Sequence, residues 1–190
     1  MIIQEIIPKK KACAFFSLHV ILTDMKKIPK TNAMRILDQA KIAYRIQSYE
    51  FDKPDHDYGL SVAKLLHQDP SRVFKTLITQ TADHHIYVFA LPVLCELDLK
   101  KGARAVNEKS LTLVPVKEIF SLSGYVRGGC SIIGMKKNYP TVFHDSALSY
   151  DTVFFSGGKI GIQLEANPQE LISLLNATSA DIIRLKRSKD

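Results

Sequence analysis

The chain has 190 residues, of which 46% are hydrophobic and 24% are charged, and its formal net charge is +7. These values are ordinary for one globular domain, and no apolar run approaches the roughly 20 residues that a membrane-spanning helix needs. Cys13, Cys95 and Cys130 form no C-x-x-C pair, which disfavours a disulfide scaffold and a zinc ribbon and favours a reducing cytoplasm.

The positive charge is concentrated at the two ends of the chain. Residues 1–30 carry a net charge of +4 and residues 181–190 carry +2, which leaves +1 for residues 31–180. Basic ends can help to bind a polyanion such as RNA. Charge alone is also typical of solvated tails with no specific partner, and we favour that second interpretation.

The N-terminal segment imitates a signal peptide, because Lys9–Lys11 precede an apolar run over residues 12–22. However, no small-residue cleavage site follows, and Met25 stands just before a polar stretch. We therefore expect residues 1–28 to be an extension and residues 29–190 to form a single domain with a basic C-terminal tail. An additional strand or helix docked on the domain is the alternative for the extension.

The first regular elements follow residue 30. Thr31 and Asn32 are N-cap types and predict a helix to about Ala40. Residues 41–51 then alternate, which predicts a strand with Ile42, Tyr44, Ile46 and Ser48 on one side. A polar loop over 52–57 and a short helix over 60–67 come next.

The middle of the chain reads as a β-hairpin over 74–80 and 85–91. Asp98 is a candidate N-cap for a helix over 99–105, and a strand over 111–114 precedes a short helix that begins at Pro115. The last third has strands over 141–144, 152–156 and 160–165, with a turn at 156–159. Asn167 and Pro168 then begin a helix. The predicted helices and strands together indicate a mixed α/β fold.

Three features indicate chemistry. Lys75 lies inside the apolar strand VFKTLI, where burial of an ammonium is costly. Glycines are frequent over 124–137 and 156–159, and glycine-rich backbone binds anions and developing oxyanions well, although neither segment matches a P-loop or a Rossmann fingerprint. A thiol hydrolase that uses Cys130, with His144 and Asp145 as partners from elsewhere in the chain, is one alternative. The spacing of the histidines does not match that of a metal site.

Taken together, these segments resemble the YbaK family of trans-editing aminoacyl-tRNA deacylases, which are related to the editing domain of prolyl-tRNA synthetases. The resemblance covers residues 29–184 and depends on landmarks that occur in order along the chain. They are AMRILDQAKIAY, SYEFD, RVFKTLI, LDLKKGAR, LSGYVRGGCSIIGMKK and VFFSGGKIGIQLEANPQEL. The resemblance implies a compact, mostly antiparallel or mixed β-barrel-like sheet flanked by helices.

The resemblance also implies an activity, the release of cysteine from mischarged Cys-tRNA(Pro), or from Cys-tRNA(Cys), by attack of the substrate's own thiol. It implies no cofactor and no metal, and a prolyl-tRNA synthetase as partner. Lys75 would hold the 3′ end of the tRNA, and the N–H groups of Gly128 and Gly129 would bind the carbonyl oxygen. Tyr49, Gln163 and Ser131 would contact the substrate.

Two positions depart from the family pattern. Gln163 stands where related sequences often have aspartate, and Ile132 stands where they often have proline. Both changes leave the amino-acid preference open. Two alternatives therefore remain, namely a deacylase of another mischarged tRNA, such as Ala-tRNA(Pro), that uses water, and a non-catalytic module that binds RNA or a synthetase. Because the family has an aliphatic residue at the position of Cys130, the resemblance argues against a catalytic thiol.

Overall fold

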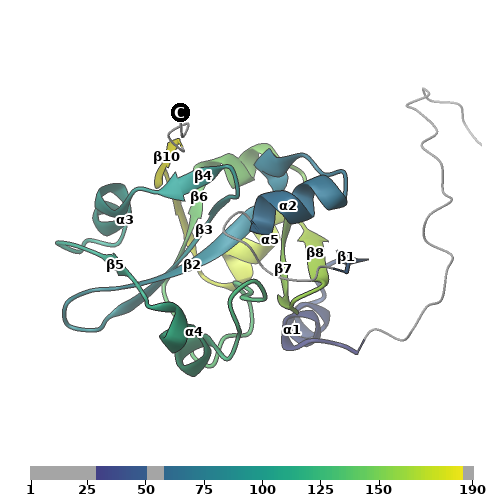
Figure 1. Ribbon diagram of the computed structural model, residues 1–190, viewed down its shortest axis with the longest axis horizontal. Helices are drawn as coiled ribbons and strands as arrows, with labels where there is room; N and C mark the ends of the chain where they lie inside the picture. Colours follow the sequence, from purple (N-terminus) through teal and green to yellow (C-terminus); the bar gives the residue numbers. More distant parts are fainter. Residues whose placement is uncertain (1–28, 51–57, 186–190) are drawn as a thin grey trace, which may run out of the picture.

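The computed structural model of the chain describes residues 29–50 and 58–185 (Figure 1). The expectations for the N-terminal extension, the 52–57 loop and the basic tail after Leu185 lie outside the described residues. Within these two ranges, no helix is long and apolar enough to cross a membrane.

The helices confirm the capping signals in the sequence. Thr31 caps the first helix by accepting a hydrogen bond from the Met34 N–H. Asp98 and Asn167 each accept from two backbone N–H groups at the starts of their helices. The helices are α1 (Asn32–Ala40), α2 (Tyr58–Leu65), α3 (Leu99–Ala105), α4 (Val116–Ser123) and α5 (Pro168–Leu174), with 3₁₀ turns η1 (Pro70–Arg72) and η2 (Asp145–Ser149).

The strands form a mixed fold, as predicted, in which most neighbouring strands are antiparallel and β3–β6 and β6–β9 are parallel. One sheet has the order β5-β2-β3-β6-β9, a second β1-β8-β7 and a third β10-β4. The strands are β1 (Tyr44–Ser48), β2 (Phe74–Gln80), β3 (Ile86–Pro92), β4 (Cys95–Leu97), β5 (Thr112–Leu113), β6 (Thr141–His144), β7 (Val153–Lys159), β8 (Ile162–Ala166), β9 (Thr178–Ala180) and β10 (Ile183–Leu185).

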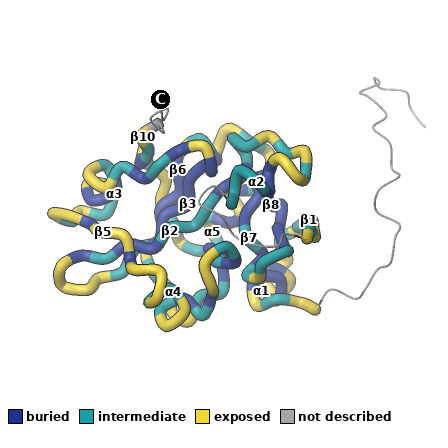
Figure 2. Tube along the Cα trace, in the orientation of Figure 1, coloured by how far each residue is buried: buried dark blue, intermediate teal, exposed yellow. Residues whose placement is uncertain are grey.

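The single barrel-like sheet implied by the resemblance is divided into these three sheets. The first two meet where a β-bridge joins Val73, just before β2, to Phe154 in β7. Helix α1 lies beside β7 at one end of the molecule, and α3 lies near β5 at the other (Figure 1). Buried residues are concentrated along β3, β6 and β8 (Figure 2).

One local prediction was wrong. The turn expected over residues 156–159 belongs to β7, which continues to Lys159 across a register shift, and the chain reverses at Ile160 and Gly161 instead. The strand predicted over residues 41–51 is confirmed as β1, in which Ile46 is exposed and Gln47 is half-buried. Among the described strands β1 pairs with β8 alone, so it lies at the edge of its sheet.

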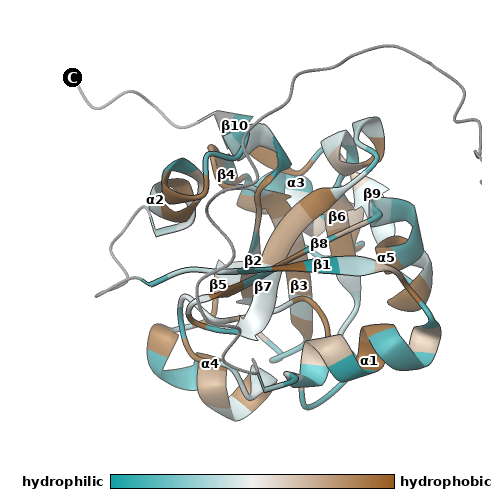
Figure 3. Cartoon of the chain, turned by 90° about the vertical axis from the view of Figure 1, so that its right-hand side faces the viewer, coloured by the Kyte–Doolittle hydropathy of each residue, from teal (hydrophilic) through white to brown (hydrophobic). Residues whose placement is uncertain are grey.

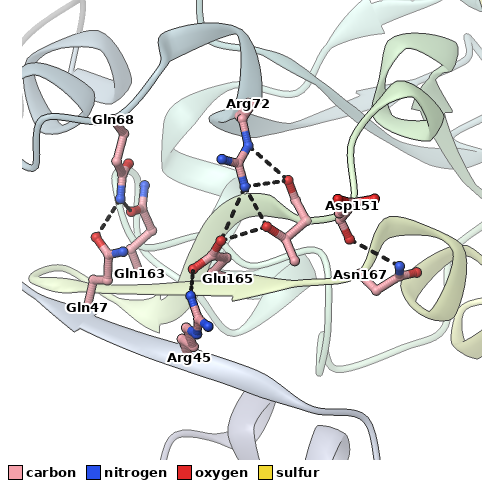
Figure 4. Close-up of polar contacts among 9 residues, drawn as sticks. Arg45, Gln47, Gln68, Arg72, Asp151, Gln163, Glu165 and Asn167 are labelled. Atoms are coloured by element: carbon pink, nitrogen blue, oxygen red, sulfur yellow. Dashed lines mark hydrogen bonds and ion pairs between the residues drawn. The ribbon is translucent and has the colours of Figure 1, made fainter. Parts of the chain in front are cut away.

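A partly buried ion pair stabilises the junction between the sheets (Figure 4). Arg72 Nη2 lies 3.2 Å from Glu165 Oε1, and the same guanidinium donates to the Thr152 carbonyl oxygen. Thr152 Oγ1 donates to Glu165 Oε1 at 2.6 Å, and the Arg72 guanidinium lies 5.0 Å from the centre of the Phe154 ring. Because Glu165 is only 8% exposed, these hydrogen bonds offset the desolvation of its carboxylate. The network holds η1, and with it the start of β2, against β7 and β8.

Candidate active site

A cavity of about 280 Å³ opens where the ends of the two larger sheets meet. One wall consists of Val73 and the first four residues of β2, and α2 and Val93 form another. The loop after α4 contributes Arg127, Gly128 and Cys130, while β7 and β8 contribute Ser156 and Gln163. Most ligand sites have volumes of about 300–1,000 Å³, so this cavity suits a small group such as one amino-acid side chain.

Lys75 lines this cavity from β2, which places the charge noted in the sequence at the candidate site. Its Nζ donates to the carbonyl oxygens of Cys95 and Val93, the latter at 3.5 Å. These carbonyl oxygens, one between β3 and β4 and one at the start of β4, replace part of the water that a half-buried ammonium loses. The side chain is therefore held in one orientation at the cavity wall, where it contributes a positive charge.

Tyr49 lines the cavity together with Tyr58, which the sequence analysis did not identify. Their hydroxyl oxygens lie 2.8 Å apart, and their rings are tilted by 51°. The Tyr49 N–H also donates to the Gly161 carbonyl oxygen, which fixes the residue against the β7–β8 turn. Burial, together with the hydrogen bond to Tyr58, raises the pKa of Tyr49 well above its ordinary value. Tyr49 is thus a neutral hydrogen-bonding group and not a base at neutral pH.

Gln163 lines the cavity from β8 and belongs to a cluster of three glutamines (Figure 4). It lies opposite Gln47 in the β1–β8 ladder, and Gln68 Nε2 donates to the side-chain oxygens of both residues at 2.6 Å. Gln68 follows α2, so the cluster joins the helix to the sheet beside the cavity. The hydrogen bonds of this cluster hold the side chain of Gln163 in one orientation, and Gln163 itself is only 4% exposed.

The glycine-rich loop brings only some of its predicted residues to the cavity. Gly128 lines it, and within the described residues its N–H makes no hydrogen bond. Gly129 does not line it, and its N–H donates to the Val126 carbonyl oxygen at 3.0 Å. A Cβ at Gly129 would lie 3.0 Å from the Ile160 nitrogen, so the loop packs here directly against the β7–β8 turn. Ser131 is fully buried outside the lining, where its Oγ accepts from the Ile133 N–H.

Cys130 lines the cavity, but its thiol is poorly suited to nucleophilic attack. Burial raises the pKa of this thiol to about 11, so it is protonated at neutral pH. His144 lies on β6 and does not line the cavity. Its nitrogens contact Ser146 and Asp145, so it is not the activating partner that the thiol-hydrolase alternative requires.

This raised pKa leads to a prediction about alkylation. Because the thiolate is the reactive form, iodoacetamide should modify Cys130 in the native protein slowly at pH 7 to 8 and faster only as the pH approaches 11. Mass spectrometry of the native protein over this pH range measures the rate, and the urea-unfolded chain supplies the reference. Cys130→Ala should retain most of the catalytic activity, because a protonated thiol is not the nucleophile. Rapid modification at pH 7, together with an inactive but folded variant, would contradict both expectations.

Two further residues that line the cavity were not identified from the sequence. Arg127 adds a second positive charge to that of Lys75. Thr76 contributes a hydroxyl that is buried and has no hydrogen-bond partner among the described residues. No aspartate, glutamate or histidine is among the described lining residues. Within the same part of the chain, no group of three or more potential metal ligands occurs. The cavity is therefore positively charged and has no described general base.

The sequence and the fold both match known proteins. Residues 57–174 match the family described as aminoacyl-tRNA editing domain. The chain is 42% identical over 154 residues to an Enterococcus faecalis protein named "Putative Cys-tRNA(Pro)/Cys-tRNA(Cys) deacylase EbsC", covering 80% of this chain and 93% of that protein.

Solved structures share the fold at lower identity. One, described as a "putative trans-editing enzyme for prolyl tRNA synthetase", has a TM-score of 0.71 at 21% identity and covers 80% of this chain and 95% of its own. Another, the hypothetical protein APE2540, has a TM-score of 0.73 at 23% identity and covers 81% of this chain and all of its own.

Proposed function

The chain belongs to the aminoacyl-tRNA editing domain family. We propose that it releases cysteine from mischarged Cys-tRNA(Pro), with Cys-tRNA(Cys) as a second substrate. The name of the Enterococcus faecalis relative supports this choice of substrate. The small volume of the cavity and its apolar residues Val62, Phe74, Leu77 and Val93 suit a cysteinyl side chain.

The proposed mechanism rests on the types of residue that line the cavity. Hydrolysis by water commonly uses a general base, and the described lining has no carboxylate or imidazole to serve as one. Burial keeps Tyr49 and Cys130 protonated, so neither of them is suited to act as that base. A substrate that carries its own nucleophile does not need the protein to activate water. We therefore assign the nucleophile to the thiol of the cysteinyl ester.

In the proposed reaction, the cysteinyl sulfur attacks the carbonyl carbon of the ester, so that a C–S bond forms and the C–O bond to the ribose breaks. The thiol proton ends on the ribose oxygen, and the products are a cysteine thiolactone and free tRNA. Because the attack is intramolecular, orientation of the sulfur supplies much of the acceleration. The reaction requires no covalent bond to the protein.

The cavity residues have distinct roles in this proposal. Lys75 and Arg127 attract the phosphate and ribose oxygens at the tRNA end. The N–H of Gly128, which makes no hydrogen bond to the described part of the chain, stabilises the carbonyl oxygen as it gains charge, and Gly129 supports that loop against the β7–β8 turn. Gln163 and Tyr49 hydrogen-bond the aminoacyl group, whereas Ser131 shapes the loop from behind the wall. A prolyl-tRNA synthetase partner would add selectivity for the tRNA.

The experiment that tests the activity measures deacylation of Cys-tRNA(Pro), Cys-tRNA(Cys), Ala-tRNA(Pro) and Ser-tRNA(Pro) in parallel with the full chain. We expect the cysteinyl esters to be consumed fastest and the thiolactone to be detected by mass spectrometry as the first product. Faster deacylation of Ala-tRNA(Pro) would instead support the water-dependent alternative. If no ester is deacylated while tRNA still binds, the chain is a binding module and the proposed activity is wrong.

Thr76 provides a prediction in which stability and activity change in opposite directions. Its buried hydroxyl has no partner in the described protein, so Thr76→Val removes an unsatisfied polar atom while keeping the shape of the side chain. The free energy of unfolding should rise by about 1 kcal/mol, and kcat/KM for Cys-tRNA(Pro) should fall roughly fivefold if the hydroxyl bonds the substrate. Urea denaturation and single-turnover kinetics measure the two quantities.

The matched control lies on the same strand. Thr79 is fully buried, does not line the cavity, and donates its hydroxyl to the Tyr87 carbonyl oxygen. Thr79→Val should therefore lower stability and leave kcat/KM unchanged. A Thr76→Val protein that is both less stable and fully active would show that the hydroxyl serves the fold and not the substrate.

A further inference from the structure

Helix α4 presents an apolar surface to solvent beside the candidate active site. Val116 and Phe120, one helical turn apart, are 56% and 58% exposed, and Val126 in the following loop is 50% exposed. Figure 2 shows that α4 is exposed over much of its length, and Figure 3 shows hydrophobic residues along it. A large exposed aromatic side chain flanked by aliphatic ones commonly marks a binding surface. We refer to Val116, Phe120, Val126 and Lys136 as the α4 platform.

Positive charge surrounds these apolar side chains. The Lys136 ammonium lies 5.0 Å from the centre of the Phe120 ring and donates to the Ser121 carbonyl oxygen at 3.2 Å. Lys117, Arg127 and Lys137 are also exposed, and Glu118 is the one carboxylate in residues 116–137. A cation held over an exposed ring, with other cations nearby, complements a ligand that has both flat faces and negative charge. The cores of protein–protein interfaces, in contrast, are depleted of charged residues.

The α4 platform is continuous with the cavity. The loop that follows α4 runs from Val126, on the platform, to Arg127 and Gly128, which line the cavity wall. Tyr125 anchors this loop, because its buried hydroxyl donates to the Ile133 carbonyl oxygen at 2.7 Å. Lys136 fastens the other end of the loop to the last turn of α4. Val126 on the platform and Arg127 on the cavity wall are therefore neighbours in one anchored loop.

We infer that the α4 platform binds the unpaired nucleotides at the 3′ end of the aminoacyl-tRNA, an inference that rests on the proposed function. A base stacks on Phe120 between Val116 and Val126, while Lys136 and Arg127 contact the adjoining phosphates. Stacking on an aromatic side chain combined with a basic track is the usual way in which proteins hold single-stranded nucleic acid. Because every base has a flat face, this contact provides affinity and direction toward the cavity without reading the sequence.

The test compares two RNA probes, an acceptor-stem minihelix of tRNA(Pro) with its unpaired 3′ end and the same minihelix trimmed to the base pairs. Fluorescence anisotropy measures the binding of each probe to the full chain. Phe120→Ala should weaken binding of the complete probe at least fivefold and leave binding of the trimmed probe unchanged. Phe120→Tyr, which keeps the ring, should restore binding. Lys136→Gln should lower the slope of log Kd against log salt by about 0.7, the value for one single-strand phosphate.

Matched controls remove comparable side chains elsewhere. Leu148→Ala deletes an apolar side chain that is 44% exposed in η2, and Lys100→Ala deletes an exposed lysine in α3, so neither should change binding. Equal affinity of wild type and Phe120→Ala for the complete probe would overturn the inference, whatever the catalytic result. If Phe120→Ala instead converts a dimer to a monomer in sedimentation, the platform is a contact between two copies and the inference is wrong. Loss of deacylation with normal Phe120-dependent binding would refute the proposed function alone.

Discussion

Replacing Lys75 with alanine should reduce kcat/KM for Cys-tRNA(Pro) by a factor of about 100 to 1,000, which is typical when one preorganised electrostatic contact in an active site is removed. Lys75 lines the cavity, and the Val93 and Cys95 carbonyl oxygens hold its ammonium in place. The charge is therefore oriented before the substrate arrives, and alanine cannot supply it. Single-turnover deacylation at saturating enzyme measures the effect on chemistry separately from that on binding.

The fold should tolerate this change. The variant loses hydrogen bonds from a charged donor, which are worth about 1.5–3 kcal/mol. It also no longer has to desolvate a half-buried ammonium, and this offsets part of the loss. We expect the free energy of unfolding to change by about 1 kcal/mol. Lys75→Met keeps the apolar stem and should be as inactive as Lys75→Ala, whereas Lys100→Ala, on the distant helix α3, should be fully active. Normal turnover by a folded Lys75→Met protein would remove this residue from the mechanism.

The local features of this fold could be predicted from the sequence because their causes are local. Thr31, Asp98 and Asn167 each occupy the N-cap position that the sequence assigned to them. A cap depends on one side chain and the next three residues, so a short window contains all the required information. The β2–β3 hairpin was predictable for the same reason, since its two strands are joined by a few polar residues.

The failure arose where a neighbouring strand determines the local structure. Residues 156–159 have the composition of a turn, yet they extend β7. A Cβ at Gly157 would lie 2.6 Å from the Ile162 side chain, so this glycine permits the close approach of β7 to β8. This contact has no signature within residues 156–159 themselves.

The candidate site was predictable to the extent that the family motifs include its residues. Lys75, Tyr49, Gly128 and Gln163 line one cavity although they lie on four separate segments. Their catalytic and binding roles remain predictions. Tyr58, Thr76 and Arg127 were missed because tyrosine, threonine and arginine are common outside active sites. What distinguishes them is their position on the cavity wall, and for Thr76 a buried hydroxyl without a described partner, and these are properties of the tertiary structure.

The identity of the nucleophile leads to the second large effect, which changes the substrate instead of the protein. Serine differs from cysteine by one atom, so Ser-tRNA(Pro) should fit a cavity of this size and bind with similar affinity. Apolar pockets separate such close analogues by only about 1–3 kcal/mol. The two nucleophiles differ far more, because a thiol with a pKa of about 8.5 is already a few per cent thiolate at pH 7, whereas a serine hydroxyl is scarcely ionised.

We therefore expect the single-turnover rate for Ser-tRNA(Pro) to be at least about 1,000-fold below that for Cys-tRNA(Pro), beyond the 10- to 200-fold that pocket fit explains. The rate with the cysteinyl ester should rise about tenfold per pH unit from pH 6 to 8, as the substrate thiol ionises. Cys130 should not add to this rise, because its own pKa of about 11 lies above that range. Rapid-quench measurements with both esters, on wild type and on Cys130→Ala, separate the two thiols. Equal rates for the seryl and cysteinyl esters would mean that water is the nucleophile, and Gln163 and Tyr49 would then be the side chains placed to hold it.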